Sequence, residues 1–158
     1  MSKKEEFISL IGQHQGLINK VTYLYADVHE DRKDLQQEII GQSWSSFKSY
    51  RGEAKFSTWL YRVALNTAIS SLKQAKRQEQ VRENILVGEG TQTSNEGELL
   101  EAILTALNSI EKSIVLLLIE GYAQREIADI LGITDGNVRI KVHRIRKKLE
   151  KYGVKDFA

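Results

Sequence analysis

Apolar residues recur at intervals of three and four along most of the chain, which is the pattern of helices that bury one face. One such stripe runs over Phe7–Tyr25 and predicts a single first helix. A second helix, for which Asp31 is a suitable N-cap, has as its inward stripe Leu35, Ile39, Ile40, Trp44 and Phe47. After a loop over residues 48–55, Ser57 or Thr58 caps a third helix. No two-residue alternation typical of strands is found, so the sequence predicts an all-α fold.

The middle of the chain has a different character. Residues 87–97 are polar and rich in glycine, which is typical of a flexible linker. Helical spacing resumes at Leu99, and a strongly apolar helix over Ile110–Ile119 ends with Gly121 as its C-cap. The sequence therefore predicts two small helical domains, over residues 1–78 and 98–158, joined by an acidic flexible linker over residues 79–97.

Residues 123–148 have the pattern of a helix-turn-helix. Ile127, Ala128 and Leu131 form the apolar face of a short helix, and Ala128 is small where two helices must cross closely. Gly132 supplies a left-handed turn residue, and Thr134 caps the next helix. The inward positions of that second helix are Val138, Val142, Ile145 and Leu149.

The opposite face of this second helix is basic. Seven bases stand against one acid between Gly136 and Lys151, a local charge of +6 in a chain whose net charge is +2. A basic outer face on the second helix is what entry into the DNA major groove requires, and about 15 residues span roughly 22 Å. A solvated face on an ordinary helical hairpin is the alternative. Turn, small residue, cap and charge agree in one place, which favours DNA binding.

The first helix of the pair begins weakly. Ala123 occupies its expected N-cap and offers no side-chain oxygen, which forgoes a cap worth about 1 kcal/mol. Glu126 has no hydroxyl partner with which to complete a capping box. Packing of Ile119, Ile127 and Leu131 must compensate.

Several classes of protein are disfavoured by composition. The chain has no cysteine, and His14, His29 and His143 lack metal-ligand spacing, so we expect no metal and no cofactor. The sequence shows no nucleophile–base pair and no phosphate-binding loop, so we do not expect an enzyme. No stretch is long enough to span a membrane, and the charged N-terminus leads into an amphipathic segment, so we expect a cytoplasmic protein without membrane insertion.

Two polar clusters in the first domain are not explained by its core. With Leu35 and Ile39 inward, Asp34, Gln37 and Glu38 share one exposed face, although solvation alone would account for them. The second cluster, residues 47–66, gathers aromatics, bases and an asparagine around a glycine-containing loop. That combination suits unstacked nucleic-acid bases, although its aromatic rings Phe47, Phe56 and Trp59 also fit a plain core.

Taken together, these motifs resemble the extracytoplasmic function (ECF) sigma factors of bacterial RNA polymerase, group 4 of the sigma-70 family. Asp34–Glu38 followed by Trp44 looks like the family's Asp-Leu-x-Gln-Glu helix, and Tyr50–Asn66 is close to its promoter-melting segment. Glu126–Ile133 with Gly136–Arg144 looks like its C-terminal DNA reader. The resemblance covers almost the whole chain, with three motifs in order.

The resemblance implies a role for each motif. Asp34, Gln37 and Glu38 would dock on the clamp coiled coil of the polymerase largest subunit, and the polymerase flap is a further expected contact. A flipped base of the melted minus-ten element would be captured, and strand opening supported, by Tyr50, Arg51, Lys55, Trp59, Arg62, Val63 and Asn66. The minus-thirty-five duplex would be read or clamped by Asn137, Arg139, Ile140, Lys141, His143, Arg144 and Lys147.

The implied function is that of a sigma factor, which binds polymerase core and promoter DNA, has a possible anti-sigma partner and associates with the nucleoid when active. The sequence departs from the family where Asn108-Ser109 replaces a common Pro, and at Asn137 and Ile140. An Asn side chain can pair with adenine, and an Ile side chain can contact a thymine methyl group. These two residues would change the base preference, so the family's consensus promoter is not assigned to this protein. The alternative is a stand-alone helix-turn-helix regulator with an N-terminal dimerisation or sensing domain.

Overall fold

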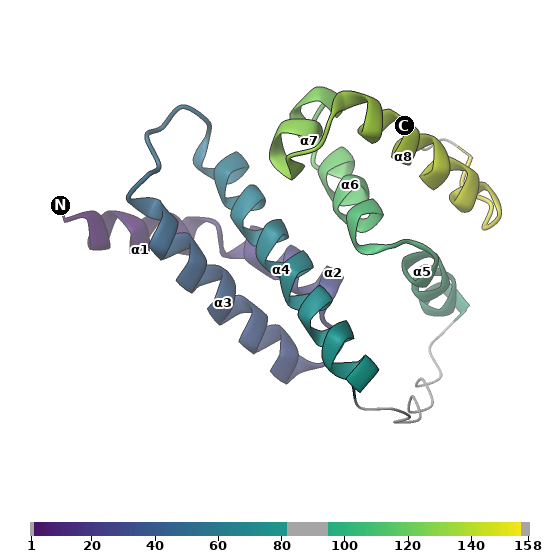
Figure 1. Ribbon diagram of the computed structural model, residues 1–158, viewed down its shortest axis with the longest axis horizontal. Coiled ribbons are helices and arrows are strands. Elements are labelled where there is room, and N and C mark those ends of the chain that lie inside the picture. Colours follow the sequence, from purple (N-terminus) through teal and green to yellow (C-terminus); the bar gives the residue numbers. More distant parts are fainter. Residues whose placement is uncertain (1, 82–94, 156–158) are drawn as a thin grey trace. The chain divides into compact units, whose positions relative to one another are not determined.

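The computed structural model describes residues 2–81 and 95–155, and within them all regular structure is helical (Figure 1). This confirms the all-α fold class. The helices are α1 (Lys3–Gln13), α2 (Gln15–Tyr25), α3 (His29–Phe47), α4 (Phe56–Val81), α5 (Asn95–Ala106), α6 (Ser109–Ile119), α7 (Gln124–Leu131) and α8 (Asp135–Glu150). The chain divides into two compact units, Met1–Glu79 and Gln80–Ala158.

The tether was expected over residues 79–97. Helix α4 continues to Val81 and α5 already begins at Asn95, so both ends of that segment are helical. The remainder of the expected linker, residues 82–94, lies outside the described residues.

The stripe predicted as one helix over Phe7–Tyr25 is two helices, α1 and α2. His14 lies between them with φ −115° and ψ 21°. Its Nδ1 donates to the carbonyl oxygen of Leu10 at 2.7 Å, and its ring packs edge-on against Phe56 at 4.9 Å. A side chain that bonds back to the preceding turn competes with the helix, and Gly12 and Gly16 lower helix propensity on both sides. Spacing alone could not show this break.

Helix α3 begins two residues before the predicted cap Asp31. Its N-cap is Val28, which makes no side-chain capping bond, and Asp31 lies in the first turn, where a carboxylate complements the helix dipole. The junction with α2 is instead held by Arg32, whose Nε donates to the carbonyl oxygen of Ala26 at 2.8 Å and whose guanidinium lies 4.0 Å from the ring centre of Tyr23.

The buried face of α3 differs in part from the predicted stripe. Leu35, Ile39 and Phe47 are buried, but Ile40 is half-buried and Trp44 is 38% exposed. Ser43 is fully buried in their place, and its hydroxyl donates to the carbonyl oxygen of Ile39 at 2.6 Å. Because that bond satisfies the hydroxyl within its own helix, the small residue can face the core at no polar cost.

Helix α4 begins at Phe56, so the prediction that Ser57 or Thr58 is its N-cap was wrong. The carbonyl oxygen of Lys55 accepts the first helical hydrogen bond, from the backbone N–H of Trp59 at 3.1 Å. Phe56 is 8% exposed and packs at 6.4 Å from the buried ring of Phe47. Burial of this first ring fixes where the helix starts.

The second unit carries the predicted helix-turn-helix. The four inward residues of α8 are all buried, as expected: Val138, Val142, Ile145 and Leu149. Gly132 has φ 70°, and the Thr134 hydroxyl accepts from the backbone N–H of Asn137 at 3.1 Å. On α7, Ile130 is buried and Leu131 half-buried, a shift of one position from the predicted face.

Helix α6 begins at Ser109 and is closed at both ends. Asn108 and Glu111 form a complete capping box, because the Asn108 side chain accepts from the Glu111 N–H at 2.9 Å and the Glu111 carboxylate accepts from the Asn108 N–H at 3.0 Å. At the other end the C-cap is Glu120, and the predicted Gly121 follows it with φ 94°. The N–H of Tyr122 then donates to Leu117.

Ala123 is the N-cap of α7, as predicted, and provides no side-chain bond. The Glu126 carboxylate accepts from the Ala123 N–H at 3.0 Å. An alanine has no side-chain acceptor, so only this half of a capping box is present. None of the described helices is long and apolar enough to cross a membrane.

Candidate nucleic-acid interface

A hollow of about 340 Å³ lies between α3 and α4 of the first unit. Its walls are Gln42 and Ser46 from α3 together with Trp59, Arg62, Val63, Asn66 and Thr67 from α4. We call it the α3–α4 hollow. Its volume is within the range of small-ligand sites. It brings together four of the predicted minus-ten residues, namely Trp59, Arg62, Val63 and Asn66.

A second hollow of about 210 Å³ lies under the loop before α4, lined by Ser49, Tyr50, Arg51, Glu53, Ala54, Trp59 and Arg62. Trp59 and Arg62 line both hollows, so the two adjoin. The Tyr50 hydroxyl donates to the carbonyl oxygen of Ala54 at 2.7 Å, and Gly52 turns the loop with φ 76°. The predicted residues Tyr50 and Arg51 therefore lie beside the α3–α4 hollow.

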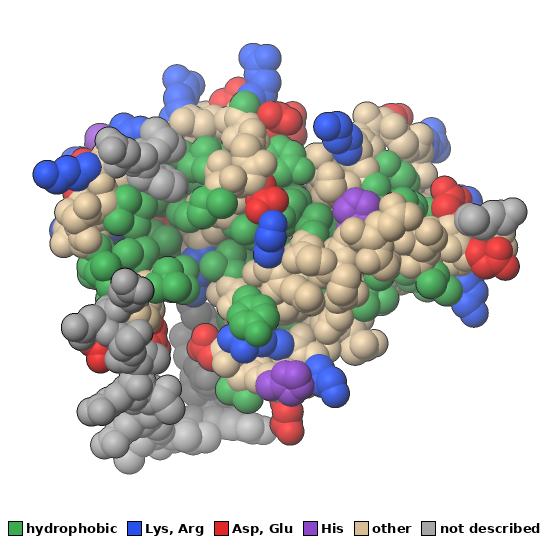
Figure 2. All heavy atoms as spheres, turned by 180° about the vertical axis from the view of Figure 1, so that it is seen from behind, with side chains coloured by type: hydrophobic (Ala, Val, Ile, Leu, Met, Phe, Trp, Pro, Cys, Tyr) green, Lys and Arg blue, Asp and Glu red, His purple; other side chains and the backbone are tan. Residues whose placement is uncertain are grey.

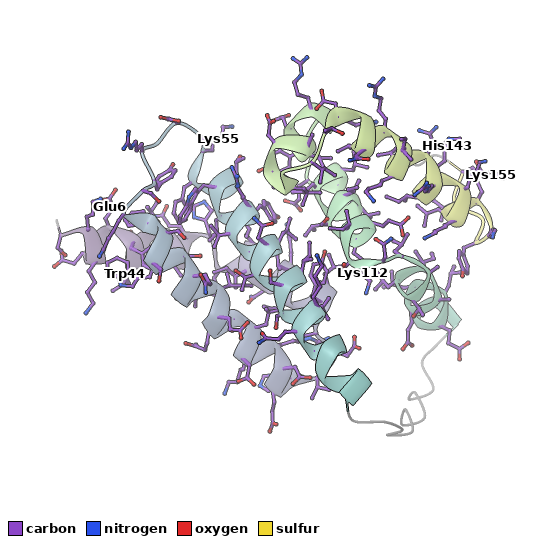
Figure 3. The ribbon with its side chains drawn as sticks, in the orientation of Figure 1. Glu6, Trp44, Lys55, Lys112, His143 and Lys155 are labelled. Atoms are coloured by element: carbon purple, nitrogen blue, oxygen red, sulfur yellow. The ribbon has the colours of Figure 1, made fainter. Side chains whose placement is uncertain are left out.

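Lys55 is the predicted minus-ten residue that lines neither hollow. It is exposed just before α4, as its label in Figure 3 shows. A lysine in that position can reach a phosphate beside the hollow but does not form part of its wall.

The aromatic residues that the sequence left between core and site divide cleanly. Phe47 and Phe56 are buried, whereas Trp59 is half-buried at the rim of both hollows. The Trp59 ring centre lies 5.4 Å from that of Phe56, 6.2 Å from Phe47 and 5.2 Å from Tyr50. Trp59 is thus held by a packed cluster and stays partly exposed at the rim.

Sequence reasoning missed three residues of the α3–α4 hollow: Gln42, Ser46 and Thr67. Glu38, Gln42 and Ser46 follow at intervals of four on α3, which puts them on one helix face. That spacing was the available signal. It identifies a shared face but does not show that the face borders α4.

The acidic residues of α3 lie on its exposed surface. Asp34, Gln37 and Glu38 are all exposed, and Asp34 and Glu38 line a hollow of about 510 Å³ to which Asp27 and Asp31 also contribute. Gln37 does not line this hollow. Within the described residues, none of the carboxylates that line this hollow has an ion-pair partner. Together they form a negative surface suited to a basic partner.

The outer face of α8 is largely exposed. Its exposed members are Asn137, Arg139, Ile140, His143, Arg144 and Lys147, whereas the predicted residue Lys141 is half-buried. Figure 3 shows His143 on the outer side of the helix, and Lys and Arg side chains project from the molecular surface in Figure 2. Ile140 is 53% exposed among these bases.

Lys148 is part of the same basic run but does not belong to this face. Its Nζ lies 2.7 Å from the Glu111 carboxylate of α6. The charge available to a ligand on α8 is therefore smaller than the count of basic residues indicates.

Comparison with known proteins identifies both units. The sigma-70 region 2 model matches residues 10–78, and the sigma-70 region 4 model matches residues 97–149. The ECF RNA polymerase sigma-E factor of Haemophilus influenzae is 29% identical, over 93% of this chain and 87% of that protein. The ECF RNA polymerase sigma factor SigW of Bacillus subtilis is 28% identical, over 94% of this chain and 89% of that protein.

Two solved structures share the fold. The sigma factor RpoE of Bartonella quintana, in complex with the anti-sigma factor NepR, has a TM-score of 0.74 and 18% identity, over 94% of this chain and 96% of that chain. CnrH, in complex with the cytosolic domain of CnrY, has a TM-score of 0.65 and 21% identity, over 94% of this chain and 87% of that chain.

The two helical units and their matched regions define a sigma factor of the sigma-70 family. Within it, the chain belongs to the ECF sigma factors, as the sequence motifs predicted. Sigma factors direct promoter-specific transcription initiation and are not enzymes. The region 2 match over the first unit sets aside the alternative of a stand-alone regulator with a dimerisation or sensing domain.

Proposed function

We propose that this sigma factor uses three surfaces in turn: the acidic face of α3 for polymerase core, the two adjoining hollows for the melted minus-ten strand, and the outer face of α8 for the minus-thirty-five duplex. The observation that carries the proposal is the α3–α4 hollow. It places an aromatic ring, a guanidinium and an asparagine amide around one space, from Trp59, Arg62 and Asn66.

These three groups match what an extruded nucleotide requires. Extruding a base costs a few kcal/mol, and stacking on an aromatic side chain returns about 1–3 kcal/mol per base. Trp59 supplies the stacking surface and Asn66 the hydrogen bonds to the base. Arg51, Lys55 and Arg62 neutralise the flanking phosphates. Tyr50 and Val63 complete the walls.

The outer face of α8 suits duplex DNA. Arg139, His143 and Arg144 lie on the side opposite the buried residues and would face base edges or phosphates, with Lys141 and Lys147 nearer the backbone. Asn137 and Ile140 add an amide and a methyl surface, which favour adenine and thymine respectively.

The acidic face of α3 suits a basic partner. Asp34, Gln37 and Glu38 would bind the clamp coiled coil of the polymerase largest subunit, with the flap as a second contact of the C-terminal domain. In this proposal residues 1–78 bind core polymerase and the melted strand, residues 79–97 form the tether, and residues 98–158 recognise the duplex. We place the protein in the cytoplasm, on the nucleoid when active. An anti-sigma factor would hold it inactive, because one structure of the same fold, RpoE of Bartonella quintana, is in complex with the anti-sigma factor NepR.

A reconstituted transcription assay with core polymerase and mapped start sites tests this function. The full-length chain should direct initiation at discrete promoters. The triple variant Asp34→Ala, Gln37→Ala, Glu38→Ala should lose core binding in a pull-down and still shift duplex DNA. A matched variant, Glu5→Ala with Glu6→Ala on exposed α1 positions, should retain both. Failure of the wild-type chain to bind core would refute the proposal.

A further inference from the structure

Gln42 lies where two grooves of the first unit meet. It is exposed on α3 and lines the α3–α4 hollow. It also lines a neighbouring groove of about 420 Å³, which we call the polar groove and whose walls are Glu38, Gln42, Asn66, Thr67, Ser70, Ser71 and Gln74. Gln42 and Asn66 therefore stand at the same junction, one from α3 and one from α4.

The hydrogen-bonding groups at this junction are not equally available. The Thr67 hydroxyl already donates to the carbonyl oxygen of Val63 at 2.7 Å. Among the described residues, no hydrogen bond or ion pair engages the side-chain amide of Gln42 or of Asn66. Each amide offers both a donor and an acceptor. Two open amides thus border a hollow sized for a small ligand.

We propose that Gln42 is a second base-reading amide, which contacts the captured minus-ten base from the α3 side while Asn66 contacts it from α4. Gln42 is then a specificity-determining residue of the melted strand. This inference rests on the proposed function, because it assigns a further residue to the same hollow.

The chemistry of Gln42 favours a base over a phosphate. A neutral amide cannot neutralise a phosphate, and Arg62, which lines both hollows, and Arg51, which lines the loop hollow, already supply the cations for that purpose. The edge of a base, in contrast, presents neighbouring donors and acceptors that an amide can match. A carboxylate only accepts hydrogen bonds. Gln42→Glu therefore removes the N–H donor of the side chain and keeps its shape. The quantity to measure is the preference among bases at the captured position.

The four bases respond differently to that change. Guanine presents two adjacent donors on its pairing edge, to which a carboxylate can bind with both oxygens. Thymine presents one donor between two carbonyl acceptors, which a carboxylate repels. Gln42→Glu should raise the preference for guanine over thymine at the captured position by at least about fivefold, the low end of what a bidentate base contact provides.

The test is a competition among promoter fragments with pre-melted minus-ten segments. Holoenzyme made with the full-length chain is offered fragments that carry each base at each non-template position, and the bound fraction is sequenced. Gln42→Glu should change the ranking at one position, and Gln42→Ala should flatten the preference there. Because Gln42 is exposed, both variants should keep the helical circular dichroism of the wild type.

Gln74→Glu is the matched control. It adds the same charge to α4 and, of the hollows described above, lines the polar groove alone, so it should weaken the binding of fragments with any of the four bases equally. If Gln42→Glu also weakens the binding of fragments with any of the four bases equally, Gln42 does not read the base. The inference is then wrong, while the proposed function stands. If the wild-type holoenzyme shows no base preference at any minus-ten position, both the inference and the proposed base capture are wrong.

Discussion

The Nζ of Lys148 lies 2.7 Å from Oε1 of Glu111 and joins the last turn of α8 to the first turn of α6. The Glu111 side chain is only 3% exposed, and the same oxygen accepts the N–H of Asn108 at 3.0 Å. One carboxylate thus closes a helix cap and anchors the end of the DNA-reading helix. We therefore expect Lys148 to position α8 rather than to contact DNA.

Lys148→Met should destabilise the C-terminal unit. The substitution leaves the Glu111 carboxylate buried with one partner fewer, and breaking a fully buried pair costs about 3–5 kcal/mol. Because the Lys148 side chain is 37% exposed, water can replace part of the interaction, and we expect about 1–3 kcal/mol. Urea unfolding of the full-length chain, followed by circular dichroism, measures the loss.

Lys147→Met is the control for that experiment, since Lys147 is the exposed neighbour of Lys148 on the same helix. Its stability should stay within about 0.5 kcal/mol of the wild type. Equal unfolding midpoints for the two variants would show that the contact between Lys148 and Glu111 contributes nothing to the fold.

Duplex binding should separate the bases of α8 by role. Arg144→Ala should weaken minus-thirty-five binding by about 1–3 kcal/mol and relax the preference at one base pair, if Arg144 contacts a base edge. Lys147→Ala should weaken binding to DNA of every sequence alike and reduce the slope of log affinity against log salt by about one. Fluorescence anisotropy over a salt series measures both.

Lys148→Met provides the contrast within the same titration. Since its ammonium is engaged by Glu111, the salt slope should stay at the wild-type value even where affinity falls. A slope reduced by about one would mean that Lys148 neutralises a phosphate, and its assignment as a positioning residue would be wrong.

Local patterns predicted the helix-turn-helix well because its determinants are local. The four buried positions of α8, the turn at Gly132 and the cap at Thr134 each follow from spacing or from one side chain beside its own backbone. The break at His14 did not follow from spacing, because the apolar stripe runs on through it, whereas the His14 side chain bonds back to Leu10 and packs against Phe56, 42 positions further along the chain.

The faces of α3 show the same limit. Hydropathy placed Trp44 inside, yet Trp44 is 38% exposed and Ser43 is fully buried. A hydroxyl bonded to its own helix can be buried cheaply, and a large ring can pack while part of it stays exposed, here with the Trp44 ring centre 5.1 Å from that of Phe7. Neither property is visible in a scale of residue hydrophobicity.

The candidate site was predictable where it is contiguous in sequence. Tyr50, Trp59, Arg62 and Asn66 fall within one segment, and the structure brings them to two adjoining hollows. Gln42 belongs to another helix, so only the pairing of α3 with α4 reveals it. The pairing of Lys148 with Glu111 is equally non-local.

Asn66→Ala should impair strand opening and spare duplex binding. The substitution removes an open amide from the α3–α4 hollow but lies on a different unit from α8. We expect open-complex formation by the holoenzyme to fall by about fivefold to a hundredfold, the range of one good base contact. Fluorescence of 2-aminopurine in the minus-ten element reports opening, and anisotropy on minus-thirty-five duplex reports binding.

Asn19→Ala is the matched control for this comparison, because Asn19 is an exposed asparagine on α2 that lines none of the described hollows at α4. It should leave both readouts unchanged. A parallel loss of opening and duplex binding in Asn66→Ala would contradict base capture and indicate a general structural defect.

Ala123→Ser should stabilise the C-terminal unit. Ala123 has φ −72° and ψ 156°, the extended conformation of an N-cap, and Glu126 already accepts from its N–H at 3.0 Å. A serine hydroxyl there can accept from the third helical N–H and complete the capping box, for a gain of about 1 kcal/mol. Urea unfolding measures it, with the exposed loop substitution Ala54→Ser as control. An unchanged midpoint would mean that packing of Ile127, fully buried on α7, already fixes the start of the helix.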